Sequence, residues 1–297
     1  MINSSWSTNY KSLAKKAELT ECLISEAPIS TIVVDVRSRL FRYIRLHYTN
    51  RTLAEKIDCA YKILYNMKDE KIKVFQKAMQ YIQDDVKMLN VSSCVYVFGS
   101  PIACPYKKAL SEYRETKRKE KWNQLQECMK RLSQHMFDID TIIECNNIFE
   151  GYLMCCLDKL YYNIEDLQFV VPDYKDNFES DKLLGKLGKK TSILSDDYDC
   201  VALFGANMMI KNVYPKWFEC VTIRDLLALF KSSTRTDLVY KCCLLGTDYN
   251  LGFKGIGPRK VTKIDKNNLQ KRVSYCLKQQ SINIEKLMQF FLQDDLQ

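Results

Sequence analysis

The sequence predicts an α/β fold with a mostly parallel central sheet that helices flank. Short apolar runs, as in buried strands, alternate with longer segments of helical periodicity along most of the 297 residues. Two of these runs lead into aspartates, and ligands bind at the carboxyl ends of parallel strands. The length allows one large α/β domain or two small ones, and a 46% hydrophobic composition is enough for a sizeable core.

The N-terminal half predicts two buried strands with helices between them. Residues 1–30 form a polar N-terminal extension without a pattern. Thr31–Val36 is an apolar strand with Asp35 at its carboxyl end, and Ser38 caps a helix over Arg39–Tyr48. Residues 53–90 have helical periodicity, and Cys94–Phe98 forms the second strand.

The C-terminal half continues the alternation. A charged helix without Gly or Pro spans about 106–136, and an apolar helical region follows at 137–166. Leu167–Val171 and Thr191–Leu194 predict strands, with a helix over Asp173–Leu187 between them. Val201–Phe204 and Met208–Ile210 predict a hairpin. Helices are predicted at 222–231, 234–245 and 281–296.

Composition and charge narrow the class of protein. No apolar run is long enough for a membrane span, and the N-terminus lacks a signal peptide. Thirteen cysteines without CxxC spacing and only two histidines favour reduced core thiols over a zinc site. The net charge is +9, and Lys107–Lys121 and Lys254–Arg272 are strongly basic, which indicates a nucleic-acid partner; solvated helix faces are the alternative.

The segment Leu244–Lys260, LLGTDYNLGFKGIGPRK, is the most informative part of the chain. It holds four of the nine glycines, and Pro258 after a glycine turn predicts a helix start whose N–H groups can hold an anion. Asp248 lies just upstream, so a metal site and a phosphodiester would share one element. The alternative is an ordinary helix–turn–helix with a solvated aspartate.

Four aspartates follow predicted elements and have the chemistry of a metal site. They are Asp35, Asp197, Asp199 and Asp248. Mg²⁺ prefers oxygen ligands, and phosphodiester hydrolysis with two metal ions needs several converging carboxylates. Each aspartate alone is more often a helix cap or a surface charge, but four together in a chain without histidine ligands favour a metal site.

The motifs resemble those of the flap endonuclease/XPG family of structure-specific 5′ nucleases. Leu244–Lys260 is similar to the family segment LLG-(S/T/C)-DY through GIGP-(K/R), and SDDYDCVALFG is similar to (S/T)-E-D-x-D-C-(L/V). The resemblance implies a PIN-like 5′-nuclease fold, with a nuclease core over 31–245 and a helical arch at about 100–165. Residues 246–297 would form a helix–two-turn–helix DNA-binding region with C-terminal helices.

The resemblance implies a ligand set for two Mg²⁺ ions, with Mn²⁺ as a substitute. Asp35, Asp197, Asp199 and Asp248 match family ligands, and Asp176 aligns with a ligand glutamate. The second ligand of that helix aligns with Phe178, so Glu179 or Asp181 would replace it in another register. Gly99 stands where the family has a ligand aspartate. The family's Met-Gly-Ile start is also replaced here by Met-Ile-Asn and extra residues.

The resemblance also implies DNA contacts. Lys107 and Arg114 match a lysine and an arginine of the arch that assist at the scissile phosphate, beside Lys117 and Arg118 on the same basic helix. Phe41 aligns with an aromatic residue that stacks on a base, although a core position explains it nearly as well. Contacts to duplex phosphates would come from Lys254, Gly255, Gly257, Arg259 and Lys260.

We therefore expect a metal-dependent 5′ flap endonuclease or exonuclease that cleaves DNA at single-strand/duplex junctions in replication, repair or recombination. The alternatives are a catalytically impaired junction-binding scaffold, motivated by Gly99, and an RNA-degrading nuclease. Branched or nicked DNA is the expected partner of an intracellular monomer. Ile284–Phe291 resembles a sliding-clamp peptide, although a packed amphipathic helix explains it better. Compactness and Lys/Asn/Tyr/Ile-rich composition suggest a poxvirus-like source, hence the nucleus or a cytoplasmic viral replication site.

Overall fold

The computed structural model describes residues 10–50, 68–99, 104–134, 179–264 and 266–292, with scattered residues between 52 and 56 and between 140 and 148. The chain divides into two compact units. The first comprises Met1–Val36, Asp85–Leu110 and Asp173–Gln297, and the second comprises Arg37–Asp84 and Ser111–Pro172. The predicted strand at 167–171, Asp176 and Phe178 lie outside the described residues.

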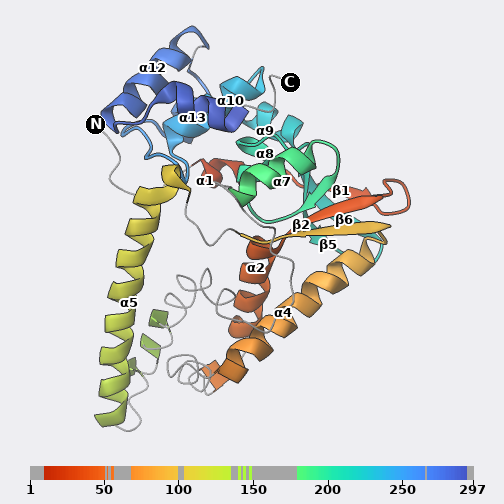
Figure 1. The fold of residues 1–297 in the computed structure, drawn as a ribbon, viewed down its shortest axis with the longest axis vertical. Helices are drawn as coiled ribbons and strands as arrows, with labels where there is room; N and C mark the ends of the chain where they lie inside the picture. Colours follow the sequence, from red (N-terminus) through yellow and green to blue (C-terminus); the bar gives the residue numbers. More distant parts are fainter. Residues whose placement is uncertain are drawn as a thin grey trace. The chain divides into compact units, whose positions relative to one another are not determined.

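The first unit is built on a six-stranded sheet with the order β1-β6-β5-β4-β2-β3 (Figure 1). β2 pairs in parallel with β3 and β4, and β4 pairs in parallel with β5. β6 is antiparallel to both β5 and β1, so among these six strands it alone runs against the others. The predicted mostly parallel sheet is confirmed. The strands are β1 (Thr20–Leu23), β2 (Thr31–Asp35), β3 (Ser93–Val97), β4 (Ser192–Leu194), β5 (Met208–Val213) and β6 (Trp217–Thr222).

The burial of each strand explains why some strands could be predicted from apolar runs in the sequence and others could not. β2 and β4 lie inside the sheet and are buried along nearly their whole length, which requires continuous apolar sequence. The edge strand β1 is mostly exposed and polar, TECL, so its sequence gives no strand pattern. Residues 1–30, which predicted no element, therefore contain both β1 and the short helix α1 (Lys11–Ala14).

The predicted hairpin of Val201–Phe204 with Met208–Ile210 is wrong. Asp199–Ala202 forms the helical turn α8, and β5 pairs instead with β6 across a turn at 214–216. The run from Val201 to Phe204 is almost completely buried on all sides. A short apolar run of that kind has no distinguishing period, so helix and strand cannot be separated by pattern.

Helices of the first unit cover the sheet and then one another. α7 packs on β2 and β4, α8 on β5, and α9 on β6, while α10 packs on α8, α9 and α12. α9 begins with a capping box in which Thr222 and Asp225 bond each other's backbone N–H groups. The helices, besides α1 and α8, are the 3₁₀ turn η1 (Pro105–Lys107), α7 (Ser180–Gly188), α9 (Ile223–Phe230), α10 (Arg235–Leu245), α11 (Pro258–Val261), α12 (Lys266–Gln279) and α13 (Ile284–Leu292).

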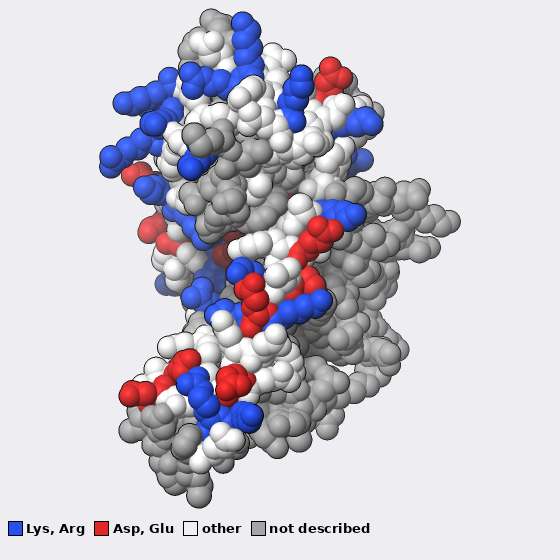
Figure 2. Space-filling model, turned by 90° about the vertical axis from the view of Figure 1, so that its left-hand side faces the viewer, with Lys and Arg blue, Asp and Glu red and all other residues white. Residues whose placement is uncertain are grey.

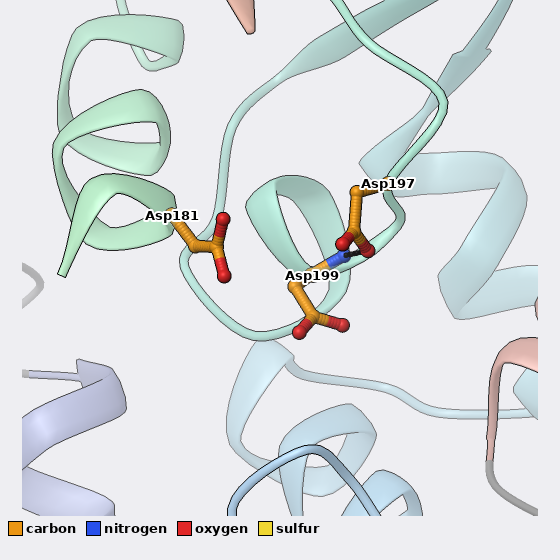
Figure 3. A group of neighbouring side chains, drawn as sticks. All are labelled: Asp181, Asp197 and Asp199. Atoms are coloured by element: carbon orange, nitrogen blue, oxygen red, sulfur yellow. Dashed lines mark hydrogen bonds between the residues drawn. The ribbon is translucent and has the colours of Figure 1, made fainter. Parts of the chain in front are cut away.

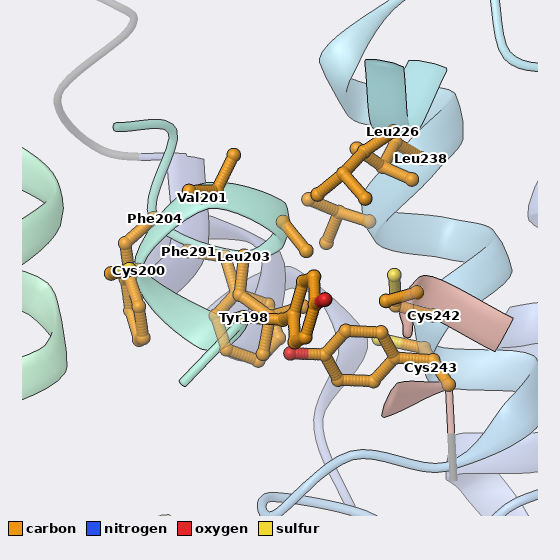
Figure 4. Close-up of a cluster of buried hydrophobic side chains, with 14 of the residues drawn as sticks. Tyr198, Cys200, Val201, Leu203, Phe204, Leu226, Leu238, Cys242, Cys243 and Phe291 are labelled. Carbon is orange, nitrogen blue, oxygen red and sulfur yellow. The ribbon is translucent and has the colours of Figure 1, made fainter. Parts of the chain in front are cut away.

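The main core surrounds α8 and fixes its position. Figure 4 shows side chains of α8 and its flanks beside residues from α9, α10 and α13. The Phe204 ring lies edge-on to Tyr249 and Phe291, at centroid distances of 5.9 and 5.6 Å. Phe291 is buried and Phe290 is partly buried within this cluster, so the paired aromatics of the sliding-clamp-like peptide pack inward, as an amphipathic helix would.

Most of α2 (Val36–Thr49), α4 (Lys68–Met88) and α5 (Lys108–Gln134) belongs to the second unit. In that unit Tyr43 stacks on Tyr81 with ring centroids 5.3 Å apart, and the buried Arg39 donates to Tyr43 Oη at 3.0 Å. α5 is long and charged, as its sequence predicts. No described helix has the length and hydrophobicity to cross a membrane, and the described cysteines are free thiols.

Gly246 ends α10 with a backbone conformation that favours glycine. Its φ angle is 95°, and a Cβ atom there would lie 2.7 Å from the backbone nitrogen of Gly252. Thr247 and Asn250 then close a tight turn, with Thr247 N–H donating to Asn250 O at 2.9 Å. Only glycine lets the chain leave α10 and turn at once toward Asp248.

We expect Gly246→Ala to lower the free energy of unfolding by about 1–3 kcal/mol, because the new methyl group strains the backbone and meets Gly252. Urea denaturation followed by circular dichroism measures the change. Gly257→Ala is the matched control: its φ is −107° and no atom lies within 4 Å of the added Cβ. Equal stability losses in the two variants would contradict this account.

Candidate metal centre and nucleic-acid surface

Asp35 and Asp197 are linked by a serine at the carboxyl edge of the sheet. Asp35 is the last residue of β2, and Ser195 directly follows β4, which lies beside β2. Ser195 Oγ donates a hydrogen bond to Asp35 Oδ2 at 2.7 Å and accepts one from Asp197 N–H at 2.9 Å. Parallel pairing of neighbouring strands therefore brings both acidic residues to one edge.

Asp199 is the first residue of α8, and its side chain is fully buried. Its N–H donates to Asp197 Oδ1 at 3.1 Å, the dashed line in Figure 3. Tyr10 Oη donates to Asp199 Oδ1. The second oxygen, Oδ2, has no hydrogen-bond partner among the described residues. Because an unpartnered buried carboxylate oxygen is costly, it points to a ligand that this oxygen would bind.

Glu179 and Asp181 come from the start of α7 and share one lysine. Lys107 Nζ lies 2.5 Å from Glu179 Oε1 and 2.8 Å from Asp181 Oδ2, and 4.7 Å from the centroid of the Tyr249 ring. One oxygen from each of Asp181, Asp197 and Asp199 lies within 4.8 Å of the others. Figure 3 shows these three carboxylates grouped together, one from α7 and two from the start of α8 and the loop before it.

Asp248 is positioned by the turn that follows Gly246. Thr247 Oγ1 accepts from Tyr249 N–H at 3.0 Å and pairs with Asn250 Oδ1 at 2.7 Å. Asn250 Nδ2 donates back to Cys243 O of α10 at 2.8 Å. The buried polar side chains thus satisfy the backbone of the turn and hold it on the helix end.

The N-terminal segment supplies a cation to this centre that the sequence did not predict. Lys11 Nζ lies 2.8 Å from Asp197 Oδ1, 3.1 Å from Asp199 Oδ1 and 3.5 Å from Asp248 Oδ2. Tyr10 N–H donates to Gly246 O at 3.0 Å, and the Tyr10 side chain is fully buried. Lys11 therefore connects the α8 carboxylates with Asp248.

The concentration of buried charge shifts the pKa values. Burial, together with the Asp197 charge, raises the pKa of Asp199 well above its usual value. Burial and the charge of Asp181 raise the pKa of Glu179 to about 7. Burial also opposes ionisation of Asp181, but the Lys107 ammonium lowers the pKa of Asp181 to about 2. Burial alone would lower the pKa of Lys11, yet Asp197, Asp199 and Asp248 raise it well above its usual range.

The donor set fits a hard divalent cation. Every candidate ligand atom is a carboxylate oxygen, which Mg²⁺ and Mn²⁺ accept, and Asp199 Oδ2 is a buried oxygen with an unmet interaction. Asp181, Asp197 and Asp199 would hold such an ion. Asp35 is connected to this group by the hydrogen bonds of Ser195, and Asp248 is connected to it by its ion pair with Lys11.

The structure brings together five of the six predicted metal ligands: Asp35, Glu179, Asp197, Asp199 and Asp248. Asp176 is outside the described residues. Asp181, which the sequence offered as the alternative to Glu179, lies in the tightest group. Ser195, Tyr10 and Lys11 were missed. Ser195 is the first residue of a matched motif and so offered a signal, but no local pattern marks Tyr10 or Lys11. Gly99 follows β3 two residues beyond Val97, the strand partner of Asp35.

The predicted phosphate contacts fall in different parts of the chain. Lys107 joins the carboxylates, whereas Arg114 lies on α5 in the second unit. On α5, Lys117 pairs with Glu120 at 2.6 Å and Arg118 with Glu115 at 2.5 Å, so neighbouring glutamates offset part of this positive charge. Phe41 on α2 is 38% exposed, which leaves its ring accessible.

A basic surface surrounds the Gly-rich turn. Lys254, Arg259 and Lys260 are exposed. The backbone at Gly255 and Gly257 is open as well, since a Cβ atom added at either glycine would have no other atom within 4 Å. Figure 2 shows Lys and Arg side chains gathered at the upper end of the molecule, where Figure 1 places α12. An open pocket of about 310 Å³ adjoins the turn and combines aromatic, apolar, amide and basic side chains, lined by Phe253, Ile256, Asn268, Lys271, Arg272 and Tyr275.

Part of the chain is similar in sequence to archaeal flap endonucleases. It is 40% identical over 85 residues to flap endonuclease 1 of Methanococcus aeolicus, covering 28% of this chain and 26% of that protein. It is 38% identical over 87 residues to flap endonuclease 1 of Methanothermobacter thermautotrophicus, covering 27% and 25%. The matches thus span about a quarter of these relatives' length. No protein-family model matches the chain.

The fold extends the similarity to nearly the whole chain. The structure aligns with the solved structure of flap endonuclease-1 from Methanococcus jannaschii with a TM-score of 0.52 and 17% sequence identity. The alignment covers 94% of this chain and 83% of the Methanococcus jannaschii chain. The chain therefore has the 5′-nuclease fold. Together with the sequence matches, this supports a relationship with the flap endonuclease/XPG family.

We expect Mg²⁺ to raise the melting temperature of the protein relative to EDTA, because an ion bound only by the folded state adds about 2.7 kcal/mol at 100 times its Kd. Asp199→Asn should lose most of this rise. Asp196→Asn is the matched control, since Asp196 lies in the same loop but points to Lys211, 4.0 Å away. An unchanged Mg²⁺ effect in Asp199→Asn would contradict the assignment.

Proposed function

We propose that this protein is a divalent-metal-dependent 5′ nuclease that cleaves DNA at single-strand/duplex junctions, in replication, repair or recombination. The observation that carries the proposal is the group of Asp181, Asp197 and Asp199, within 4.8 Å of one another at the carboxyl edge of a 5′-nuclease sheet. The similarity to flap endonucleases supports the same conclusion.

The carboxylates would hold Mg²⁺, with Mn²⁺ as a substitute and two ions as the family resemblance implies. Bound there, the ions would supply a hydroxide nucleophile and neutralise the charge that develops on the phosphate. Ser195 fixes the orientation of Asp35 and of the loop that carries Asp197. The family resemblance implies that Lys107 and Arg114 assist at the scissile phosphate, and Lys107 would turn from its carboxylates to do so.

The Gly-rich turn would hold the duplex portion of the substrate. Exposed Lys254, Arg259 and Lys260 suit phosphate contacts, which position DNA without reading its sequence. The adjoining pocket places the rings of Phe253 and Tyr275 beside Lys271 and Arg272. Rings next to cations suit unpaired nucleotides at a junction, and the proposed partner is therefore branched or nicked DNA.

Two other functions each have an observation in their favour. Gly99 stands two residues beyond the carboxyl end of β3, where the family has a ligand aspartate, so a junction-binding scaffold without catalysis is the second candidate. Phosphate contacts at the turn do not select the sugar, so an RNA nuclease of the same fold is the third.

We expect Asp197→Ala and Asp248→Ala each to reduce cleavage of a 5′-flap DNA substrate by about a hundredfold or more, because each removes a carboxylate from the proposed metal centre. Binding to the flap should persist in a gel-shift assay. Asp196→Ala is the control and should cleave normally.

The same assay separates the three candidates. Cleavage of DNA flaps in Mg²⁺ or Mn²⁺ supports the proposed nuclease. Tight flap binding without cleavage at millimolar metal supports the scaffold, and Gly99→Asp would then be tested for restored cleavage. Faster cleavage of a matched RNA flap supports the RNA nuclease.

We expect single replacements of Lys254, Arg259 and Lys260 by Ala to weaken duplex binding. Each should also reduce the slope of log K against log salt by about 1, because one phosphate fewer is neutralised by the protein. Fluorescence anisotropy with a labelled duplex at several salt concentrations measures both the affinity and the slope. Lys286→Ala, an exposed lysine on α13, is the control and should leave the slope unchanged.

A further inference from the structure

Two lysine ammonium groups contact five carboxylates of the candidate metal centre between them. Lys107 contacts the pair at the start of α7, Glu179 and Asp181. Lys11 contacts the other group, which consists of Asp197, Asp199 and Asp248. The proposed hydrolysis gives Lys107 a role at the phosphate, but it gives none to Lys11.

Lys11 is held in place by its neighbours along the chain. Tyr10 is bonded through its backbone to Gly246 O and through its hydroxyl to Asp199 Oδ1. On the other side, Leu13 and Ala14 of α1 are buried in the main core. With anchors on both sides, the Lys11 side chain starts from a fixed point beside the carboxylates, and only 19% of it is exposed.

An ion and the Lys11 ammonium compete for the same oxygens. Lys11 Nζ lies within 3.5 Å of one oxygen from each of three carboxylates, so a cation bound to those oxygens would meet a like charge at close range. Of the two Asp199 oxygens, Lys11 and Tyr10 both contact Oδ1, and Oδ2 has no hydrogen-bond partner among the described residues. One ion can therefore bind at Asp199 Oδ2 while Lys11 stays in place.

We propose that Lys11 is a built-in cation that fills one half of the metal centre, so that the protein binds one divalent ion readily and a second only by displacing Lys11. This inference rests on the proposed metal centre. It makes Lys11 a determinant of how many ions the site takes up. Removing the charge of Lys11 should open the second position.

The test counts bound Mn²⁺ on the full chain, using electron paramagnetic resonance to follow free Mn²⁺ during titration. The unaltered protein (the parent) should bind one ion tightly, whereas Lys11→Met should bind two. The Kd for the second ion should be at least about tenfold lower in Lys11→Met than in the parent. Lys11→Arg keeps the charge and should bind one. Lys16→Met, an exposed lysine beyond the same helix, is the matched control and should also bind one.

Each outcome decides between distinct conclusions. Two ions of equal affinity in both parent and Lys11→Met, or one ion in both, would overturn the role of Lys11 and leave the metal centre standing. No bound Mn²⁺ in any form would overturn the metal centre and this inference together. Failure of the nuclease proposal would show separately, as uncut flaps with the Mn²⁺ counts as expected. The parent titration alone is decisive if Lys11→Met misfolds, since two tight ions would contradict the proposal.

Discussion

Repulsion among buried carboxylates constrains the rest of this structure. Asp199 is fully buried next to Asp197, and Asp181 lies within reach of both. Such charges are tolerated only when cations and hydrogen bonds compensate them. Two lysines and a tyrosine hydroxyl do so here, and each comes from an element distant in sequence. The compensation therefore ties the N-terminal segment, η1, α7, α8 and the turn after α10 into one assembly.

The apolar core makes this arrangement possible by fixing the elements from behind. α8 is enclosed by α7, α9, α10 and the aromatic cluster that includes Phe291, so Asp199 at its first residue cannot withdraw toward water. Gly246 likewise fixes the position of Asp248, since its positive φ lets the chain turn directly at the end of α10. Packing thus holds charges that would otherwise move apart, which is typical of sites organised to bind a ligand.

Features with a local sequence pattern were predictable, and those that depend on distant contacts were not. The apolar runs of β2, β3 and β4 indicated the parallel part of the sheet, and aspartates at strand ends indicated the ligand candidates. β6 was not predicted because it is a half-exposed hairpin strand, and β1 was not predicted because it is a polar edge strand. Tyr10 meets Asp199 across 189 positions. No pattern within residues 1–30 predicts that contact.

Two features of the site, Gly99 and Lys11, change its charge in the same electrostatic direction. An uncharged Gly99 follows β3 where the resemblance implies an aspartate, and Lys11 adds an ammonium beside Asp197. Either change reduces the negative charge available to cations. A site with one fewer carboxylate and one more ammonium needs less metal charge for neutrality than a site that has the aspartate and lacks Lys11. On this reasoning Gly99 and Lys11 are linked, and the absent carboxylate alone is weak evidence that catalysis is lost.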